Sequence, residues 1–209
     1  MLIWARYFVI YLEIVKMKLK PEIMETILTA AESLFNEQGY CPVSLELVAE
    51  SAGVSKRTLY KYFGDKNGLV CKVLEKRNAF FKKSLTDVIA VFSGRKDKIN
   101  AIVSWHIKWF NDKNYRGCMF VRAKAEYDNK SEEVCAIVKE HKQWIQDSIC
   151  QCLGGTEQSL EPALLIMLIL EGMISYTSIF GVDGYDFERE KMYIYDIIDS
   201  IDSAKQATE

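Results

Sequence analysis

The sequence predicts an all-α protein. Apolar residues recur every three or four positions through most of the chain, which is the spacing of a helix face, and no alternating strand pattern persists between turn signals. Proline, which disrupts helix interiors, occurs only at positions 21, 42 and 162. With 209 residues, 49% of them hydrophobic, and a net charge of −2, the chain is long enough to bury a core and too apolar to be disordered.

The first 16 residues are apolar but too short and too charged to span a membrane. They also lack the positive start and the small-residue cleavage site of a secretory signal. Three interpretations stay open: an extension of the first helix, an amphipathic segment on a membrane surface, or a stretch upstream of a natural start at Met17, which we favour. A clear helix follows from Pro21 to Gln38, and Gly39 ends it.

The stretch SLELVAESAGVSKRTLYKYF predicts two short helices joined by a tight turn. Ser44 is a good N-cap for the first helix, because its hydroxyl can accept from an unpaired amide of the first turn. Gly53 stands where the helix end requires a left-handed residue. Ser55 caps the second helix, and Leu59 and Phe63 face inward at i, i+4 spacing. This is the plan of a helix-turn-helix, whose second helix enters the major groove of DNA.

Charge supports the same interpretation. Residues 21–50 contain six acids and no Lys or Arg, whereas residues 55–77 contain seven bases and two acids. A nearly neutral protein can therefore present a local basic face to phosphates. The outward face of the second motif helix carries only cations and hydroxyls: Lys56, Arg57, Thr58, Tyr60, Lys61 and Tyr62.

The stretch GVSKRTLYKYFGDKNGL resembles the signature of the tetracycline-repressor (TetR/AcrR) family of bacterial transcriptional regulators, and ILTAAESLFNEQGY resembles that family's first helix. The resemblance covers residues 21–77 and implies a cytoplasmic homodimeric repressor that binds a double-stranded DNA operator and is released by an unknown small-molecule inducer. We therefore expect a DNA-binding domain over 17–77 and a regulatory and dimerisation domain over 78–209. Two rivals remain: a dimeric ligand-binding module that has lost operator recognition, and a small-molecule enzyme.

We assign the expected DNA contacts by aligning this sequence with the family motif. Lys56, Arg57 and Thr58, in the first turn of the second motif helix, are expected to contact base edges. Tyr60 is expected to meet a thymine methyl or a phosphate. Phosphate contacts, which fix register without reading sequence, fall to Ser44, Lys61, Tyr62 and Lys66. Glu46 stands where family members carry a base-contacting Arg or Lys, and because an acid repels phosphate we expect no such contact there.

The rest of the chain reads as a series of helices. Asp65 is expected to cap a helix from Lys66 to about Phe92, roughly 40 Å long, which both domains share. After a polar break at 93–98 and apart from a turn at 111–117, the expected helices are 99–110, 118–129, 131–153, 160–180 and 188–204.

The helix at 160–180 is apolar on nearly all faces, although its longest uninterrupted apolar run, eight residues from Ala163 to Leu170, is too short to span a membrane. Such a helix is buried either inside one subunit or between two. Together with the family resemblance, the two last helices predict a homodimer through residues 160–204.

Catalytic chemistry finds no support in the sequence. His106 and His141 lie beside aromatic residues and belong to no catalytic motif, so we expect no enzyme, no metal and no cofactor. The six cysteines form no CxxC pair, and we interpret them as reduced residues of a cytosolic protein, with redox sensing by Cys150 and Cys152 as a minor alternative.

Aromatic residues with a few polar neighbours predict a small-molecule pocket in the C-terminal domain, although plain core packing is the alternative at each position. The candidate lining residues are Trp105, His106, Trp109, Phe120, His141, Trp144, Met173, Tyr176 and Thr177.

Overall fold

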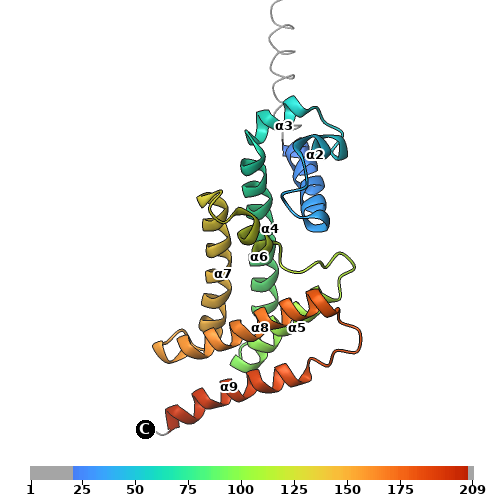
Figure 1. Cartoon of the computed structure of the whole chain (residues 1–209). Helices are drawn as coiled ribbons and strands as arrows, with labels where there is room; N and C mark the ends of the chain where they lie inside the picture. Colours follow the sequence, from blue (N-terminus) through green and yellow to red (C-terminus); the bar gives the residue numbers. More distant parts are fainter. Residues whose placement is uncertain (1–20, 207–209) are drawn as a thin grey trace, which may run out of the picture. The chain divides into compact units, whose positions relative to one another are not determined.

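The computed structural model describes the backbone of residues 21–206 and the side chains of residues 21–201 (Figure 1). Every regular element in these residues is a helix, which confirms the predicted all-α class. The interpretations offered for residues 1–16 lie outside the described residues. The chain divides into two compact units, one that ends at Glu75 and one that begins at Lys76.

The first unit contains the helix through residues 21–38, α2 (Leu45–Ser51), α3 (Lys56–Phe63) and the first part of α4 (Lys66–Ile89). Gly39 ends the first helix with φ +86°, as its position predicts. Next to it, the rings of Phe35 and Tyr40 lie 5.0 Å apart inside the core. The apolar stripes of the helices meet in a core that includes Ile27, Ala31, Phe35, Val48, Leu59, Leu69 and Val73.

The second unit contains the remainder of α4 and the elements that follow it. These are α5 (Arg95–Phe110), α6 (Met119–Tyr127), α7 (Glu132–Cys152), the 3₁₀ turn η1 (Glu157–Ser159), α8 (Leu160–Phe180) and α9 (Glu188–Gln206). Helix α8 packs against both α7 and α9 (Figure 1). The core between these helices includes Ile99, Ile102, Ile149, Ala163, Ile166, Leu170, Ile194 and Ile198.

The junction between α4 and α5 differs from its prediction. Helix α4 ends at Ile89, because Val91 and Phe92 continue the apolar pattern but are 77% and 44% exposed, with no core to pack on. Helix α5 already begins at Arg95, where the amide of Lys98 donates to the carbonyl oxygen of Gly94 at 3.0 Å. The predicted polar break at 93–98 is therefore wrong beyond Gly94. Long charged side chains are good helix formers when their heads reach water.

Helix α8 buries one side and exposes the other. Its inner side packs Ala163, Ile166, Leu170 and Met173, whereas Leu168 is 58% and Ile179 69% exposed. By length and composition the stretch Glu157–Phe180 would be able to cross a membrane, and 39% of its most apolar window is buried. Core helices of soluble proteins pass the same test. On its buried side, α8 packs against α7 and α9.

Candidate DNA-binding surface and ligand pocket

Serine caps define the two helices of the helix-turn-helix. The Oγ of Ser44 accepts from the amide of Leu47 at 3.1 Å and starts α2. The Oγ of Ser55 accepts from the amide of Thr58 at 3.1 Å and starts α3. Between them, Gly53 takes φ +64°, and an added Cβ there would meet no atom within 4 Å. Glycine is therefore favoured for its backbone conformation rather than for space.

Helix α3 has one buried side and one exposed side. Leu59 is fully buried and Phe63 is 7% exposed, so both face the core of the first unit. Lys56, Arg57 and Lys61 are exposed, Tyr60 is 45% exposed, and Thr58 and Tyr62 are half-buried. Cationic and hydroxyl groups therefore lie on the surface of a capped helix whose N-terminus carries a partial positive charge.

Glu46, in the first turn of α2, forms an ion pair with Lys56 at the start of α3. The hydrogen bond between them lowers the pKa of the Glu46 carboxyl and raises the pKa of the Lys56 ammonium. The Lys56 ammonium also lies 5.8 Å from the centre of the Tyr60 ring. The sequence identified Glu46 as an acid in an unusual position. It did not predict this pair, although an acid in the first turn of one motif helix and a lysine at the start of the next is a usable signal.

The remaining predicted phosphate contacts have partners within the first unit. The Nζ of Lys66, which is half-buried, donates to the carbonyl oxygen of Cys41 at 2.9 Å. The Nζ of Lys61 lies 5.9 Å from the centre of the Tyr62 ring. Ser44 accepts a bond as the cap of α2, and its hydroxyl hydrogen is a separate donor. Asp65 caps α4 as expected, since its Oδ1 accepts from the amide of Gly68 at 2.8 Å.

Comparison with known proteins identifies the domain that carries this surface. The model of bacterial regulatory proteins of the tetR family matches residues 27–73, which hold the whole helix-turn-helix. This match identifies residues 27–73 as a DNA-binding domain of the TetR family. The chain is 40% identical over 58 residues to the HTH-type transcriptional regulator HbdR of Aromatoleum sp. (strain CIB), a match that covers 28% of this chain and a quarter of HbdR.

Solved structures extend the likeness of fold to most of this chain. SCO4454, a TetR-family regulator from Streptomyces coelicolor, superposes with a TM-score of 0.74 at 20% identity, over 86% of this chain and 88% of the other. The sav143 protein from Streptomyces avermitilis gives a TM-score of 0.72 at 19% identity, over 86% and 98%. At these identities the likeness shows the all-helical fold of the second unit as well as the first.

Five of the nine residues predicted for the ligand pocket form one aromatic cluster, in which Trp105 and Trp109 are partly buried. Phe81 of α4, which the sequence did not single out for the pocket, lies at its centre, with the ring of Trp105 at 4.9 Å and that of Trp109 at 5.3 Å. The rings of Phe120 and His141 are stacked at 3.6 Å. His106 is the fifth member, with its ring 5.1 Å from that of Trp105.

Both histidines of the cluster are buried, each 1% exposed. The Nδ1 of His106 lies 2.8 Å from the carbonyl oxygen of Ile102, and the Nδ1 of His141 lies 3.0 Å from the Oδ1 of Asn78, so each Nδ1 carries the hydrogen and donates it. Burial lowers the pKa of His106 to about 4, and burial with the nearby charge of Lys142 lowers the pKa of His141 to about 3. Both rings are therefore neutral at pH 7.

The other four predicted pocket residues lie elsewhere in the second unit. Trp144 is half-buried under the ammonium of Lys82, which lies 5.8 Å from its ring centre, and it lines a surface groove. Met173 is buried in the core. Tyr176 is 43% exposed and packs on the ring of Tyr185 at 4.7 Å. Thr177 lines a separate pocket, and the structure therefore divides the nine predicted residues among five environments.

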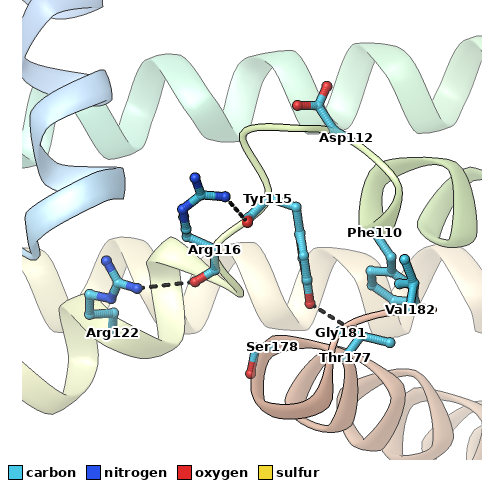
Figure 2. A pocket seen from close by; sticks show the side chains of 9 residues that line it. All are labelled: Phe110, Asp112, Tyr115, Arg116, Arg122, Thr177, Ser178, Gly181 and Val182. Carbon is cyan, nitrogen blue, oxygen red and sulfur yellow. Dashed lines mark hydrogen bonds between the residues drawn. The ribbon is translucent and has the colours of Figure 1, made fainter.

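That pocket has a volume of about 410 Å³ and lies where the loop between α5 and α6 meets the end of α8 (Figure 2). Its lining residues are Phe110, Asp112, Tyr115, Arg116, Arg122, Thr177, Ser178, Gly181 and Val182. Of these, only Thr177 belongs to the predicted set. The loop residues Tyr115 and Arg116 were missed because they fall in a stretch that reads as a polar turn. A signal was available in the basic and aromatic side chains gathered around Gly117.

Proposed function

We propose that this protein is a sequence-specific DNA-binding transcriptional regulator, a repressor that acts on chromosomal DNA in the cytoplasm as a homodimer. One observation carries the proposal: α3 is capped by Ser55, anchored by Leu59 and Phe63, and turns Lys56, Arg57, Tyr60 and Lys61 toward solvent. A helix held in this way can enter a major groove without first rearranging. The family match supports it, and the function requires no catalytic group.

We assign base reading to the front of α3. Lys56, Arg57 and Thr58 occupy its first turn, where an approaching helix end meets base edges. Arginine suits guanine in particular, because its planar fork matches the O6 and N7 acceptors. Tyr60 lies one turn further and would meet a thymine methyl or a phosphate. Ser44, Lys61, Tyr62 and Lys66 would contact phosphates, and Lys66 would then exchange or share its bond to the carbonyl of Cys41.

The homodimer would form through α8 and α9. Both helices keep large apolar side chains at the surface of the single chain: Leu164, Leu165, Leu168, Ile179 and Phe180 on α8, and Met192 and Tyr193 on α9. Exposed apolar side chains gathered on two helices that pack together favour an interaction site. A two-fold partner offering the same face would cover it and form a four-helix bundle.

A small molecule bound in the second unit would release the DNA. Helix α4 is continuous from Lys66 to Ile89 and therefore belongs to both compact units. A shift of α4 produced in the C-terminal domain (78–209) would be transmitted to the DNA-binding domain (17–77). The spacing of the two recognition helices in the dimer would then no longer match two half-sites about one helical turn apart.

Selection of bound fragments from a random DNA pool, with and without cell extract, tests this proposal. We expect the selected DNA to contain two related half-sites, and the extract to weaken binding to them. Affinity should fall steeply with salt, since each phosphate contact releases counterions. Recovery of DNA without any shared sequence would instead support a ligand-binding module that has lost operator recognition.

A further inference from the structure

The pocket between the α5–α6 loop and the end of α8 is preformed. The hydroxyl of Tyr115 lies 2.9 Å from the carbonyl oxygen of Ile174 and 2.9 Å from the Oγ1 of Thr177, which ties the loop to α8 (Figure 2). Gly117 approaches α8 so closely that an added Cβ would lie 3.0 Å from the Cβ of Ser178. These contacts fix the loop on the helix, so a ligand would not have to order it first.

The charged lining of this pocket is predominantly cationic. Arg116 and Arg122 both contribute, and a bond of 3.0 Å from Nη2 of Arg122 to the carbonyl oxygen of Arg116 brings the two residues together. Arg116 itself donates through Nη1 to the carbonyl oxygens of Lys113 and Tyr115, which leaves the Nε and Nη2 edge of its fork for a ligand. The one acidic lining residue, Asp112, already accepts from the amide of Asn114 through Oδ1 at 2.7 Å.

The apolar lining residues Phe110 and Val182 lie on the other side of Tyr115. Figure 2 shows Arg116 and Arg122 on one side of the Tyr115 ring and Phe110 and Val182 on the opposite side. The Phe110 ring lies 5.4 Å from that of Tyr115, so the apolar side is a packed aromatic wall. A volume of about 410 Å³ falls within the range of small-molecule sites. The lining thus combines a cationic end with an apolar end.

We propose that this pocket binds a small organic acid, with its carboxylate on the guanidinium of Arg116 and its apolar body against the ring of Tyr115, which Phe110 supports from behind. Arginine pairs with carboxylates through two parallel hydrogen bonds, which fixes the orientation of the acid as well as adding affinity. The claim that this pocket holds the regulatory ligand rests on the function proposed above. The claim that it binds carboxylates does not, because that binding can be tested without DNA.

The test compares acids with neutral isosteres on the full chain in the absence of DNA. Phenylacetate and hexanoate are titrated by calorimetry beside phenylacetamide and hexanamide, which have the same bodies without the charge. We expect at least one acid to bind about tenfold or more tightly than its amide, since a hydrogen bond to a charged group is the stronger kind. Failure of both acids to bind, or equal affinities of acid and amide, would overturn the proposal.

Matched variants locate the binding group. Arg116→Gln should lower the affinity for the acid about tenfold and leave the weak binding of the amide unchanged. Arg116→Lys should fall between, because it keeps the charge and loses the fork. Lys113→Gln removes one positive charge from the same loop outside the pocket lining and should change affinity less than about twofold. Equal losses in Arg116→Gln and Lys113→Gln would show that the acid is attracted by general charge and contradict the assigned site.

The two proposals fail separately. An acid that binds through Arg116 without releasing selected DNA would leave the carboxylate site in place and contradict its regulatory role. A chain that binds its selected DNA but shows no preference for acids over amides would contradict the carboxylate site and leave DNA binding intact.

Discussion

The ammonium of Lys56, at the start of α3, is ion-paired with the carboxylate of Glu46, in the first turn of α2. The pair joins the two helices of the helix-turn-helix on their exposed surface, where both side chains are about half exposed. The centre of the Tyr60 ring lies 5.8 Å from the same ammonium. In the function proposed above, Lys56 would approach DNA already oriented, and the acid beside it would oppose the unspecific attraction of a free lysine to phosphate.

Replacing Glu46 by glutamine should make DNA binding stronger but less selective. Without the carboxylate, Lys56 can contact any phosphate, so affinity for random DNA should rise about three- to tenfold, and more than affinity for selected DNA. The slope of log affinity against log salt should steepen by about 0.9, one added phosphate contact. Fluorescence anisotropy at several salt concentrations measures both. Glu50→Gln, which removes an exposed charge from the same helix outside the pair, is the control, and equal behaviour of the two variants would argue against the assigned role.

Ser55→Ala should loosen α3 without affecting the rest of the fold. The substitution removes the acceptor for the Thr58 amide at the start of the helix, and losing such a cap costs about 1 kcal/mol. Hydrogen exchange of the α3 amides should accelerate about fivefold, while α7 keeps its protection. Ser51→Ala, at the exposed end of α2, should leave α3 unchanged. Unaltered α3 protection in Ser55→Ala would contradict the role of the cap.

Leu168→Glu should prevent dimerisation. Leu168 is 58% exposed on α8, and a two-fold interface would place the new carboxylate in apolar surroundings twice, once from each subunit. The dimer dissociation constant should rise at least about a hundredfold, as measured by sedimentation velocity. Val121→Glu adds the same charge at an exposed apolar position on α6 and should leave the dimer intact. Dimers of equal strength in both variants would exclude the α8 face.

The stability of the second unit should fall as the pH drops below about 6.5. The folded-state pKa values of His106 and His141 are lowered to about 4 and about 3, so between these values and 6.5 the unfolded chain binds the protons. Each histidine contributes a loss of up to about 1.4 kcal/mol per pH unit. Urea unfolding between pH 6.5 and 5 should show this slope, and His141→Gln should reduce it. If the pH slope of the unfolding free energy is unchanged in His141→Gln, protonation of His141 does not destabilise the fold.

The helix-turn-helix was predictable from sequence because its determinants are local. Ser44, Gly53 and Ser55 each set the backbone within three or four residues, so the sequence alone predicts the two caps and the turn. The structure confirms all three. The end of α4 was missed for the opposite reason: Val91 and Phe92 continue the helical pattern, and only the absence of a neighbouring core ends it. The Glu46–Lys56 pair spans ten residues and depends on how two helices cross.

The pocket was predictable only in part, because it is assembled from distant segments. Aromatic content located the cluster around Trp105 and His141, but did not distinguish packed rings from a cavity wall. Trp144 and Tyr176 sit on helix faces directed away from that cluster, and a single sequence does not fix which way those faces turn. Arg116 enters the pocket because the loop folds back onto α8, which depends on the bonds of Tyr115 to a helix about 60 residues later, and Arg122 joins it from α6.

Binding by Arg57→Ala and Lys66→Ala, each compared on selected and on random DNA, tests most directly whether the outer face of α3 reads sequence. Arg57→Ala should lose about ten- to a hundredfold affinity for selected DNA, lose much less on random DNA, and relax the preference at one base pair. Lys66→Ala should weaken binding to both DNAs by the same factor. Equal losses on both DNAs for Arg57→Ala would contradict the account, because Arg57 would then contribute only charge.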